Sequence, residues 1–159
     1  MTLRRREFMA SLPALAAGPV LAAPAATGEP VRWPALTLLD GTPWTPQPDR
    51  AKVVVFWSVT CPFCKRHNAH IDKLHRAAGD GGPQLLTVSR DRDAAAVRRY
   101  LAANGYGFPV TLDHDPLAAV LAARRIIPLT VLIDRQGRLK QALPGEMFEE
   151  DVMELLKLA

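Results

Sequence analysis

The feature that most constrains the fold is an apolar run in the middle of the chain, Lys52-Val53-Val54-Val55-Phe56-Trp57. It is rich in β-branched side chains and does not alternate with polar residues, so it predicts a strand buried on both faces. Such a strand needs other elements packed on each side of its sheet. A helix is expected directly after it, over residues 62–78, ended by Gly79-Asp80-Gly81-Gly82.

Strands and helices alternate along the rest of the chain. Asp93 is a good N-cap for a helix over 94–104, and Asp115-Pro116 predicts the start of a helix that runs to Arg124. A hairpin is expected over 35–45. The remaining elements are strands over residues 84–88, 108–112, 129–133 and 138–143, and a closing helix over residues 148–158. This order predicts an α/β fold, with a mixed central β-sheet flanked by helices and preceded by an N-terminal β-hairpin.

Size and charge narrow the classes of function. A chain of 159 residues fits one domain. Its formal net charge is +4, and the basic residues are scattered rather than gathered in a stripe or patch. Nucleic-acid binding would need such a patch, so no nucleic-acid partner is expected.

The first 26 residues have the pattern of an export signal peptide. Arg4-Arg5-Arg6 precede an apolar segment over residues 10–23, which is too short and too interrupted to span a bilayer. The stretch from Arg5 to Met9 resembles the twin-arginine export signal of bacteria. Cleavage is expected after Ala22, Ala25 or Ala26, because Pro24 would follow a cut after Ala23. We therefore expect a periplasmic domain over residues 27–159.

The candidate site is Cys61-Pro62-Phe63-Cys64, which holds both cysteines of the chain. Two cysteines three apart, after a buried strand and at the start of a helix, indicate redox chemistry. The helix N-terminus stabilises a thiolate at Cys61, and Cys64 lies one turn inward, where it can resolve a mixed disulfide. Two alternatives are a plain structural disulfide and a metal clip completed by His67 or His70.

With these residues, the sequence resembles the TlpA/ResA-like (redoxin-type) branch of the thioredoxin superfamily. The resemblance rests on the strand–CxxC–helix order, on the later stretch from Ile127-Pro128 to Asp134, and on the opening hairpin. The element over residues 84–112 matches the extra strand–helix insertion of that branch. Together these features cover residues 31–159, and they imply a thioredoxin-like fold.

The resemblance also implies roles for particular residues. Pro128 is expected to be a cis-proline facing the disulfide, and the backbone of Ile127 to pair with an extended substrate segment. We assign Pro62, Phe63 and Trp57 to the same substrate-binding region, with Trp57 as a platform beneath the disulfide. The implied partners are exported thiol or disulfide proteins, apocytochrome c among them, and a membrane electron donor. No cofactor is implied, and a monomer is expected.

The sequence departs from the family where a carboxylate normally accepts a proton. The position of the buried Asp of thioredoxin is Val55, and the position of the Glu in the ResA-like branch is His67. His67 shares a helix face with Cys64, so it is a candidate catalytic residue that accepts the proton of Cys64 near neutral pH. The alternative is a core histidine bonded to a backbone carbonyl, with no kinetic role.

Three functions follow from this pattern. The first is a periplasmic protein-disulfide reductase that acts through Cys61 and Cys64. The second is a thiol oxidant with the same residues and the opposite direction. The third is a copper carrier that binds the metal with both cysteines and a histidine, for which His114 is the distal candidate.

Overall fold

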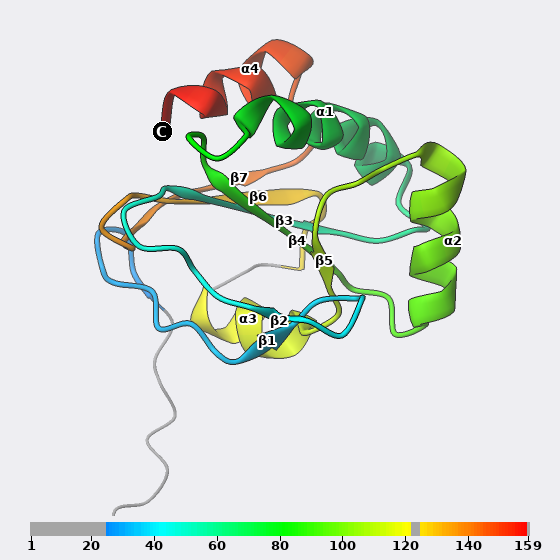
Figure 1. Ribbon diagram of the computed structural model, residues 1–159, viewed down its shortest axis with the longest axis horizontal. Helices are drawn as coiled ribbons and strands as arrows, with labels where there is room; N and C mark the ends of the chain where they lie inside the picture. Colours follow the sequence, from blue (N-terminus) through cyan, green and yellow to red (C-terminus); the bar gives the residue numbers. More distant parts are fainter. Residues whose placement is uncertain (1–24, 122–124, 159) are drawn as a thin grey trace, which may run out of the picture.

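The computed structural model describes residues 25–121 and 125–158, and its centre is a five-stranded mixed sheet (Figure 1). The strand order is β5-β4-β3-β6-β7, with β3 parallel to β4, β4 parallel to β5, and β6 antiparallel to both of its neighbours. The strands are β3 (Lys52–Trp57), β4 (Gln84–Ser89), β5 (Val110–Thr111), β6 (Leu129–Ile133) and β7 (Leu139–Pro144). The expected mixed sheet is confirmed.

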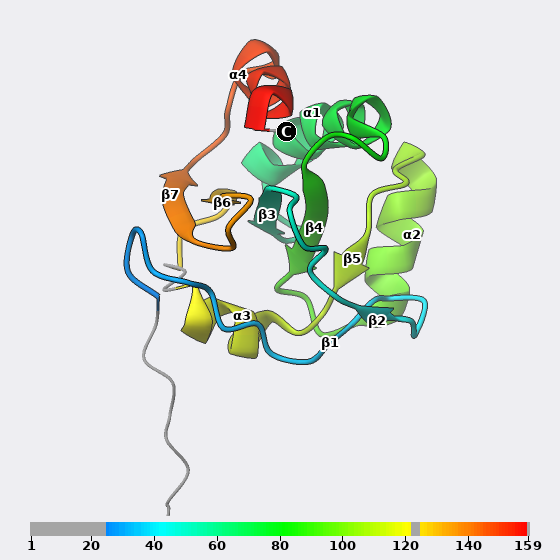
Figure 2. The same cartoon turned by 60° about the vertical axis from the view of Figure 1, so that its left-hand side comes forward.

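Helices and a small hairpin cover the two faces of this sheet. Helices α1 (Pro62–Ala78) and α4 (Glu149–Glu154) lie on one face, and α3 (His114–Val120) lies on the other (Figure 1). The expected hairpin is also present: β1 (Leu36–Thr37) pairs with β2 (Pro43–Trp44) on the α3 side. Helix α2 (Ala94–Asn104) lies beside the β5 edge (Figure 2). These elements form the layered α/β fold that the sequence predicts.

The central strand explains why both faces must be covered. All six residues of β3 are buried, and successive side chains enter two different hydrophobic clusters. Val54 and Phe56 belong to the cluster under α3 and the hairpin, whereas Val53, Val55 and Trp57 belong to the cluster under α1. Because side chains alternate along a strand, an unbroken apolar run serves two cores at once.

Local signals in the sequence set several element ends. Helix α1 has the predicted limits, with Cys61 as its N-cap and Pro62 in its first turn. Helix α2 also has the predicted limits: the carboxylate of Asp93 accepts the N–H of Ala95, and Gly105 is left-handed at φ 66°. A left-handed residue after a helix favours glycine because it has no Cβ.

Other predicted limits are wrong, for reasons that lie in tertiary contacts. The strand expected over 108–112 is only Val110–Thr111, since just these residues pair with β4. Helix α3 begins at His114 rather than after Asp115, and it ends at Val120. Its N-cap, Asp113, makes no side-chain cap and instead accepts the N–H of Thr37 at 2.7 Å. The expected end of this helix, residues 122–124, lies outside the described residues.

Two smaller differences concern the end of the chain. Strand β7 is shifted by one residue from the predicted 138–143. The closing helix expected over 148–158 is α4 followed by a 3₁₀ turn, Leu155–Leu158. Phe148 is its N-cap residue and is 78% exposed. The single predicted helix is therefore two short ones.

The described chain begins inside the predicted signal peptide. Residues 1–24, and with them most of that prediction, lie outside the described residues. Ala25 is buried, and its N–H donates to the carbonyl of Val120 at 2.9 Å. The N–H of Ala26 donates to Glu29 at 3.1 Å. Among the described residues, no helix has the length and apolar character needed to cross a membrane.

Candidate active site

The two cysteines form a disulfide at the start of α1, with their Cα atoms 5.2 Å apart. Cys61 is the N-cap, and its Sγ accepts the N–H of Cys64 at 3.2 Å. Cys61 is half-buried, whereas Cys64 is 0% exposed. A partner can therefore reach Cys61 and not Cys64. The helix N-terminus and the N–H of Cys64 both favour negative charge on Cys61 when the disulfide is reduced.

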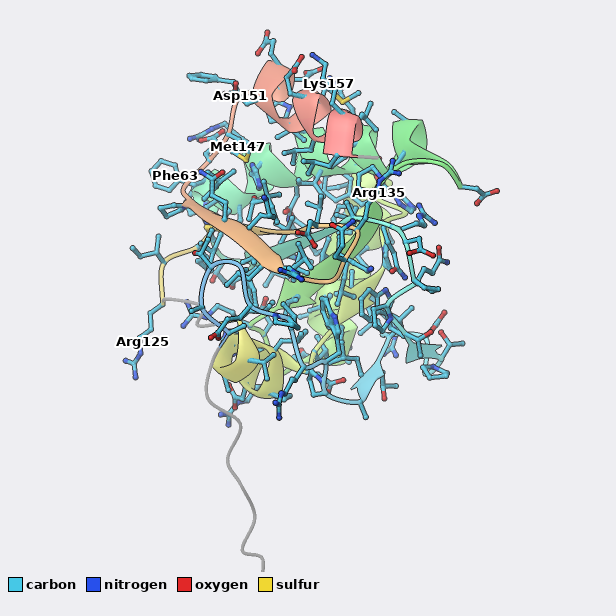
Figure 3. The ribbon with its side chains drawn as sticks, turned by 90° about the vertical axis from the view of Figure 1, so that its left-hand side faces the viewer. Phe63, Arg125, Arg135, Met147, Asp151 and Lys157 are labelled. Atoms are coloured by element: carbon cyan, nitrogen blue, oxygen red, sulfur yellow. A yellow bond between two sulfur atoms is a disulfide. The ribbon has the colours of Figure 1, made fainter. Side chains whose placement is uncertain are left out.

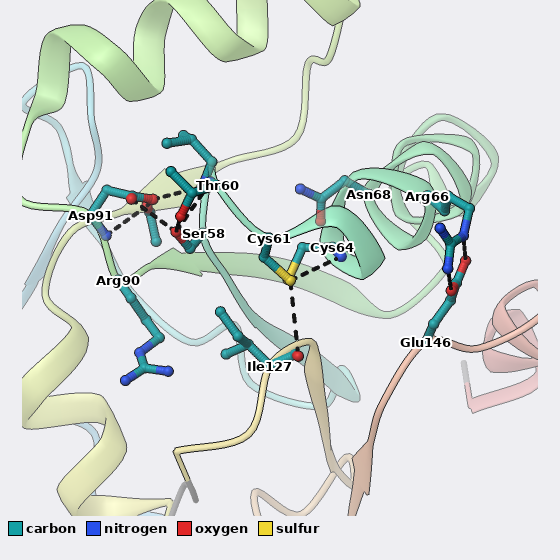
Figure 4. Close-up of a disulfide and its surroundings, with 12 residues drawn as sticks. Ser58, Thr60, Cys61, Cys64, Arg66, Asn68, Arg90, Asp91, Ile127 and Glu146 are labelled. Atoms are coloured by element: carbon teal, nitrogen blue, oxygen red, sulfur yellow. Dashed lines mark hydrogen bonds and ion pairs between the residues drawn. A yellow bond between two sulfur atoms is a disulfide. The ribbon is translucent and has the colours of Figure 1, made fainter.

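A segment 66 residues further along the chain borders the exposed sulfur. The Ile127–Pro128 peptide bond is cis, as expected, and Pro128 leads directly into β6. The carbonyl oxygen of Ile127 lies 4.0 Å from Sγ of Cys61 (Figure 4). Ile127 is half-buried, so part of this segment remains accessible beside the disulfide.

The residues between the cysteines are exposed. Pro62 is exposed, and Phe63 is 57% exposed and projects from the surface on the side where Met147 and Arg125 also lie (Figure 3). The guanidinium of Arg66 lies 5.1 Å from the centre of the Phe63 ring. A large apolar side chain this exposed is available for contact with a partner.

Trp57 does not fit the substrate-binding role assigned to it. Its side chain is 0% exposed and packs between Tyr100, at 5.1 Å between ring centres, and Phe108, at 6.1 Å. The last residue of β3 is buried like the five before it, so its ring cannot touch a substrate. The prediction of a substrate contact is wrong, and Trp57 is a residue of the core.

His67 lies in the core on the same face of α1 as Cys64. Its Nδ1 accepts the N–H of Met147 at 3.3 Å, and its Nε2 lies 3.1 Å from Oγ1 of Thr130. Because Nδ1 is the acceptor, the ring proton is on Nε2 and is donated to Thr130. Burial of the 0%-exposed ring, and secondarily the neighbouring His70, lowers the pKa of His67 from 6.5 to about 4.

This geometry favours the interpretation of His67 as a core histidine without a kinetic role. Both ring nitrogens have partners, so no lone pair is open to the Cys64 proton, and a pKa of about 4 makes a weak base at neutral pH. The partners differ from the expected backbone carbonyl: they are a backbone N–H and a hydroxyl. His67 thereby ties α1 to β6 and to the segment before α4.

Sequence reasoning missed a carboxylate that anchors the loop before Cys61. Asp91 accepts the hydroxyl of Ser58 at 2.9 Å, the N–H of Val59 at 2.8 Å and the hydroxyl of Ser89 at 2.7 Å. Figure 4 shows this network beside the disulfide. Trp57 pairs with Ser89 across parallel β3 and β4, so the residues that follow both strands meet at one edge. Knowledge of that pairing would have found Asp91.

The histidines do not gather around the cysteines. His67 is engaged as above, His70 lies 3.5 Å from Glu149, and Nδ1 of His114 lies 2.9 Å from Asp115. The ring of His114 packs edge-on against Phe56 on the other face of the sheet. Across residues 25–121 and 125–158, no three His, Cys, Asp or Glu side chains are grouped to hold a metal ion.

Fold and site together define a thioredoxin-like protein with a CxxC disulfide at a helix N-terminus. The redoxin family model matches residues 22–156, and the chain belongs to this family. Its sequence is 28% identical over 103 residues to the thiol-disulfide oxidoreductase ResA of Halalkalibacterium halodurans, covering 65% of this chain and 58% of that protein. It is 30% identical over 107 residues to ResA of Bacillus subtilis, covering 64% and 59%. The chain thus spans less than three fifths of the length of these relatives.

Solved structures share the fold. The thiol:disulfide interchange protein of Chlorobium tepidum superposes with a TM-score of 0.72 at 19% identity, covering 87% of this chain and 99% of that one. StoA from Bacillus subtilis superposes with a TM-score of 0.66 at 22% identity, covering 76% and 93%. At these identities the likeness establishes the fold, and the activity has to be argued from the site.

Proposed function

We propose that this protein is a thiol–disulfide oxidoreductase that works as a protein-disulfide reductase. The reduced Cys61 thiolate attacks one sulfur of a substrate disulfide, and the substrate's other sulfur leaves as a thiolate. Cys64 then gives up its proton, which passes to the departing thiolate, and attacks Sγ of Cys61. The bond to the substrate breaks, and the released sulfur takes a proton from water. The substrate leaves as a dithiol with two electrons gained, and the protein keeps the Cys61–Cys64 disulfide.

The observation that carries this proposal is the difference between the two cysteines. Cys61 is half-buried at a helix N-terminus and accepts an N–H, so it is the reachable and stabilised thiolate. Cys64 is wholly buried one turn inward, bonded to Sγ of Cys61. A structural disulfide needs no such asymmetry, and a bridge that closes so short a loop adds little stability.

The weak stabilisation of the Cys61 thiolate favours the reducing direction. Strong oxidants stabilise their reduced form by holding the thiolate tightly. Here no cationic side chain among the described residues is bonded to Cys61. Of the basic residues on α1 near it, Arg66 is paired with Glu146 at 2.6 Å and His67 is neutral at pH 7. Thiolate stabilisation therefore rests on the helix N-terminus and one N–H. This modest stabilisation supports a reductase.

The substrates we propose are disulfides in exported proteins, apocytochrome c among them, and the electrons would come from a dithiol donor at the membrane. The accessible edge at Ile127 and the exposed ring of Phe63 support contact with an extended protein segment. The export-signal pattern within the first 26 residues supports a periplasmic location and the twin-arginine route. Outside the cytoplasm, disulfides form and persist, so a dedicated reductase has substrates there.

The deciding experiment is the reduction potential of the Cys61–Cys64 pair, measured by equilibration with thiol buffers and alkylation. We expect a value near or below about −220 mV, toward that of thioredoxin. A value near about −120 mV would reverse the direction and make the protein an oxidant. Absence of a reversible two-electron transition, with stoichiometric copper in the purified protein, would replace the proposal with a metal carrier.

The mature N-terminus is a further prediction of this export proposal. Cleavage after Ala25 or Ala26 would cut away the buried Ala25 and its bond to Val120, whereas cleavage after Ala22 would keep them. We therefore expect mature protein from a native bacterial host to begin at Ala23. Intact-mass measurement checks this, and a mature chain that begins at Ala26 or Thr27 would contradict it.

A further inference from the structure

An unpartnered buried acceptor lies directly behind the disulfide. Asn68 follows Cys64 by four residues on α1, and both side chains are 0% exposed. The Nδ2 group of Asn68 donates to the hydroxyl of Tyr100 at 3.3 Å, but its Oδ1 has no hydrogen-bond partner among the described residues. In Figure 4 the oxygen of the Asn68 amide is turned toward the side on which the two cysteines lie.

A buried carbonyl without a donor is costly, so its position calls for a physical reason. In the disulfide state neither sulfur carries a proton, so the side chain of Cys64 has nothing to donate, and its backbone N–H is directed to Sγ of Cys61. Reduction breaks the S–S bond, and with two electrons and a proton from an external dithiol Cys64 becomes a thiol, which has an S–H to donate. Residues four apart on a helix are neighbours on one face. The missing donor therefore arises beside Asn68 only when the protein is reduced.

We propose that Oδ1 of Asn68 accepts the S–H of Cys64 in the reduced protein and is a positioning residue for the resolving thiol. The proposal rests on the redox function of the Cys61–Cys64 pair. Nδ1 of His67, an acceptor on the same face, already receives the N–H of Met147. Two other buried groups among the described residues have no hydrogen-bond partner. Nε1 of Trp57 is a donor and cannot take the proton, and Nδ1 of His70 lies 3.5 Å from Glu149.

This contact acts on one redox state alone. It stabilises the reduced protein relative to the disulfide, so it raises the reduction potential. It also holds the proton on Cys64, which leaves the thiolate on Cys61 where a substrate can reach it. Cys64 then loses its proton only after the mixed disulfide has formed at Cys61. Asn68 thus ensures that Cys61 attacks the substrate before Cys64 attacks Cys61.

The first test compares redox equilibria of the wild type, Asn68→Leu and Tyr100→Phe in glutathione buffers. Leucine has a similar volume and no acceptor, so we expect the equilibrium constant for reduction to fall about fivefold, as for one lost hydrogen bond. At 29.6 mV per tenfold this equals about 20 mV toward a lower potential. Tyr100→Phe removes the other partner of the same amide and leaves Oδ1 in place, so its equilibrium should stay near that of the wild type.

The second test observes the thiol itself. In Cys61→Ser the buried Cys64 is the only thiol, and its S–H stretching band is read by infrared spectroscopy. We expect the band to move to higher wavenumber when Asn68→Leu is added, because the hydrogen bond is lost. If the leucine variant does not fold, Asn68→Ala takes its place in both tests.

The outcomes separate this proposal from the one it rests on. An unchanged S–H band, an unchanged equilibrium in Asn68→Leu, or an equal fall in Tyr100→Phe would overturn the role of Asn68 while leaving the reductase intact. A wild type without any reversible two-electron transition would instead overturn the proposed function.

Discussion

The two sides of the disulfide are built differently. The loop before Cys61 is held by polar contacts near the surface, in which Asp91 gathers two hydroxyls and one N–H. The face of α1 behind Cys64 is shielded from solvent: Cys64, His67 and Asn68 are all 0% exposed. In the loop several hydrogen bonds together fix the backbone. On the helix face the buried polar side chains are shielded from solvent and have only one or two hydrogen-bond partners each, and Oδ1 of Asn68 has none.

This difference indicates what each side controls. The loop sets where the attacking sulfur lies, so changes there should act on reactivity with modest cost to stability. The buried face sets which groups hold protons, so changes there should act on stability, its dependence on pH, and the redox equilibrium. Substitutions on the two sides should therefore give different signatures.

The largest expected effects come from replacing each cysteine in turn, and they distinguish the attacking sulfur from the resolving one. Cys61→Ser should abolish disulfide reduction, because a hydroxyl is not ionised near neutral pH and does not attack the substrate. Cys64→Ser should still attack but fail to resolve, and so accumulate a mixed disulfide with the substrate. Turnover of a model disulfide protein, followed by non-reducing gels, reads both results. A Cys64→Ser protein that turns over normally, or a Cys61→Ser protein that traps substrate, would reverse the assigned roles.

The next effect concerns His67 and the pH. Its pKa is about 4 in the folded protein, against 6.5 when exposed. As the pH falls below 6.5, the unfolded chain takes up a proton that the folded protein does not, so the free energy of unfolding should decrease until the pH reaches about 4. The full loss is on the order of 3 kcal/mol, and it should be absent above pH 6.5. Denaturant unfolding between pH 4 and pH 7.5 measures it.

The matched variant for this prediction is His67→Gln, which cannot titrate. It should be less stable at pH 7, because the N–H of Met147 loses its acceptor, at a cost of about 1–3 kcal/mol. Its stability should vary less with pH by the amount assigned to His67. If the same decrease persists in His67→Gln, the pH dependence belongs to other groups and the buried neutral histidine is not its source.

On the loop side, Asp91→Asn should affect reactivity more than stability. An amide has one acceptor oxygen for the three donors that Asp91 now receives, so we expect a loss of about 1–2 kcal/mol. The displaced loop should lower kcat/KM roughly tenfold through misplacement of Cys61. Steady-state kinetics and thermal unfolding measure the two effects.

Asp93→Asn is the control for this change, since it makes the same chemical substitution two residues further on. Asp93 is the N-cap of α2, where asparagine caps about as well. Its kinetics and stability should match those of the wild type. Equal kinetic losses in both variants would show that Asp91 has no special part in placing Cys61.

The sequence predicts best what depends on local patterns. The limits of β3, α1 and β6 follow from an unbroken apolar run, from helix-ending glycines and from a proline before a strand. The two cysteines are likewise found because strand, motif and helix adjoin in the chain. These features need no knowledge of distant contacts.

What the sequence does not predict depends on which strands become neighbours. Asp91 reaches Ser58 only because β4 lies beside β3 in parallel register. His67 finds Thr130 across 63 residues, and the single orphaned oxygen of Asn68 is visible only once its surroundings are packed. Trp57 shows the opposite error: its place next to the motif suggested contact with substrate, but the alternation of β3 directs it into the core.

The smallest expected effect is at the surface beside Phe63. Arg66 donates to both carboxylate oxygens of Glu146, at 2.7 and 2.6 Å, and lowers the pKa of Glu146. Because Arg66 is largely exposed, Arg66→Gln should lower Tm by less than about 3 °C, and 1 M salt should remove the difference. Lys73→Gln breaks a comparable exposed pair with Glu149 at 2.6 Å, away from Phe63, and should be equally mild. Only Arg66→Gln should also raise KM, since Arg66 lies over the Phe63 ring. Equal KM values in the two variants would remove Arg66 and its ring contact from substrate binding.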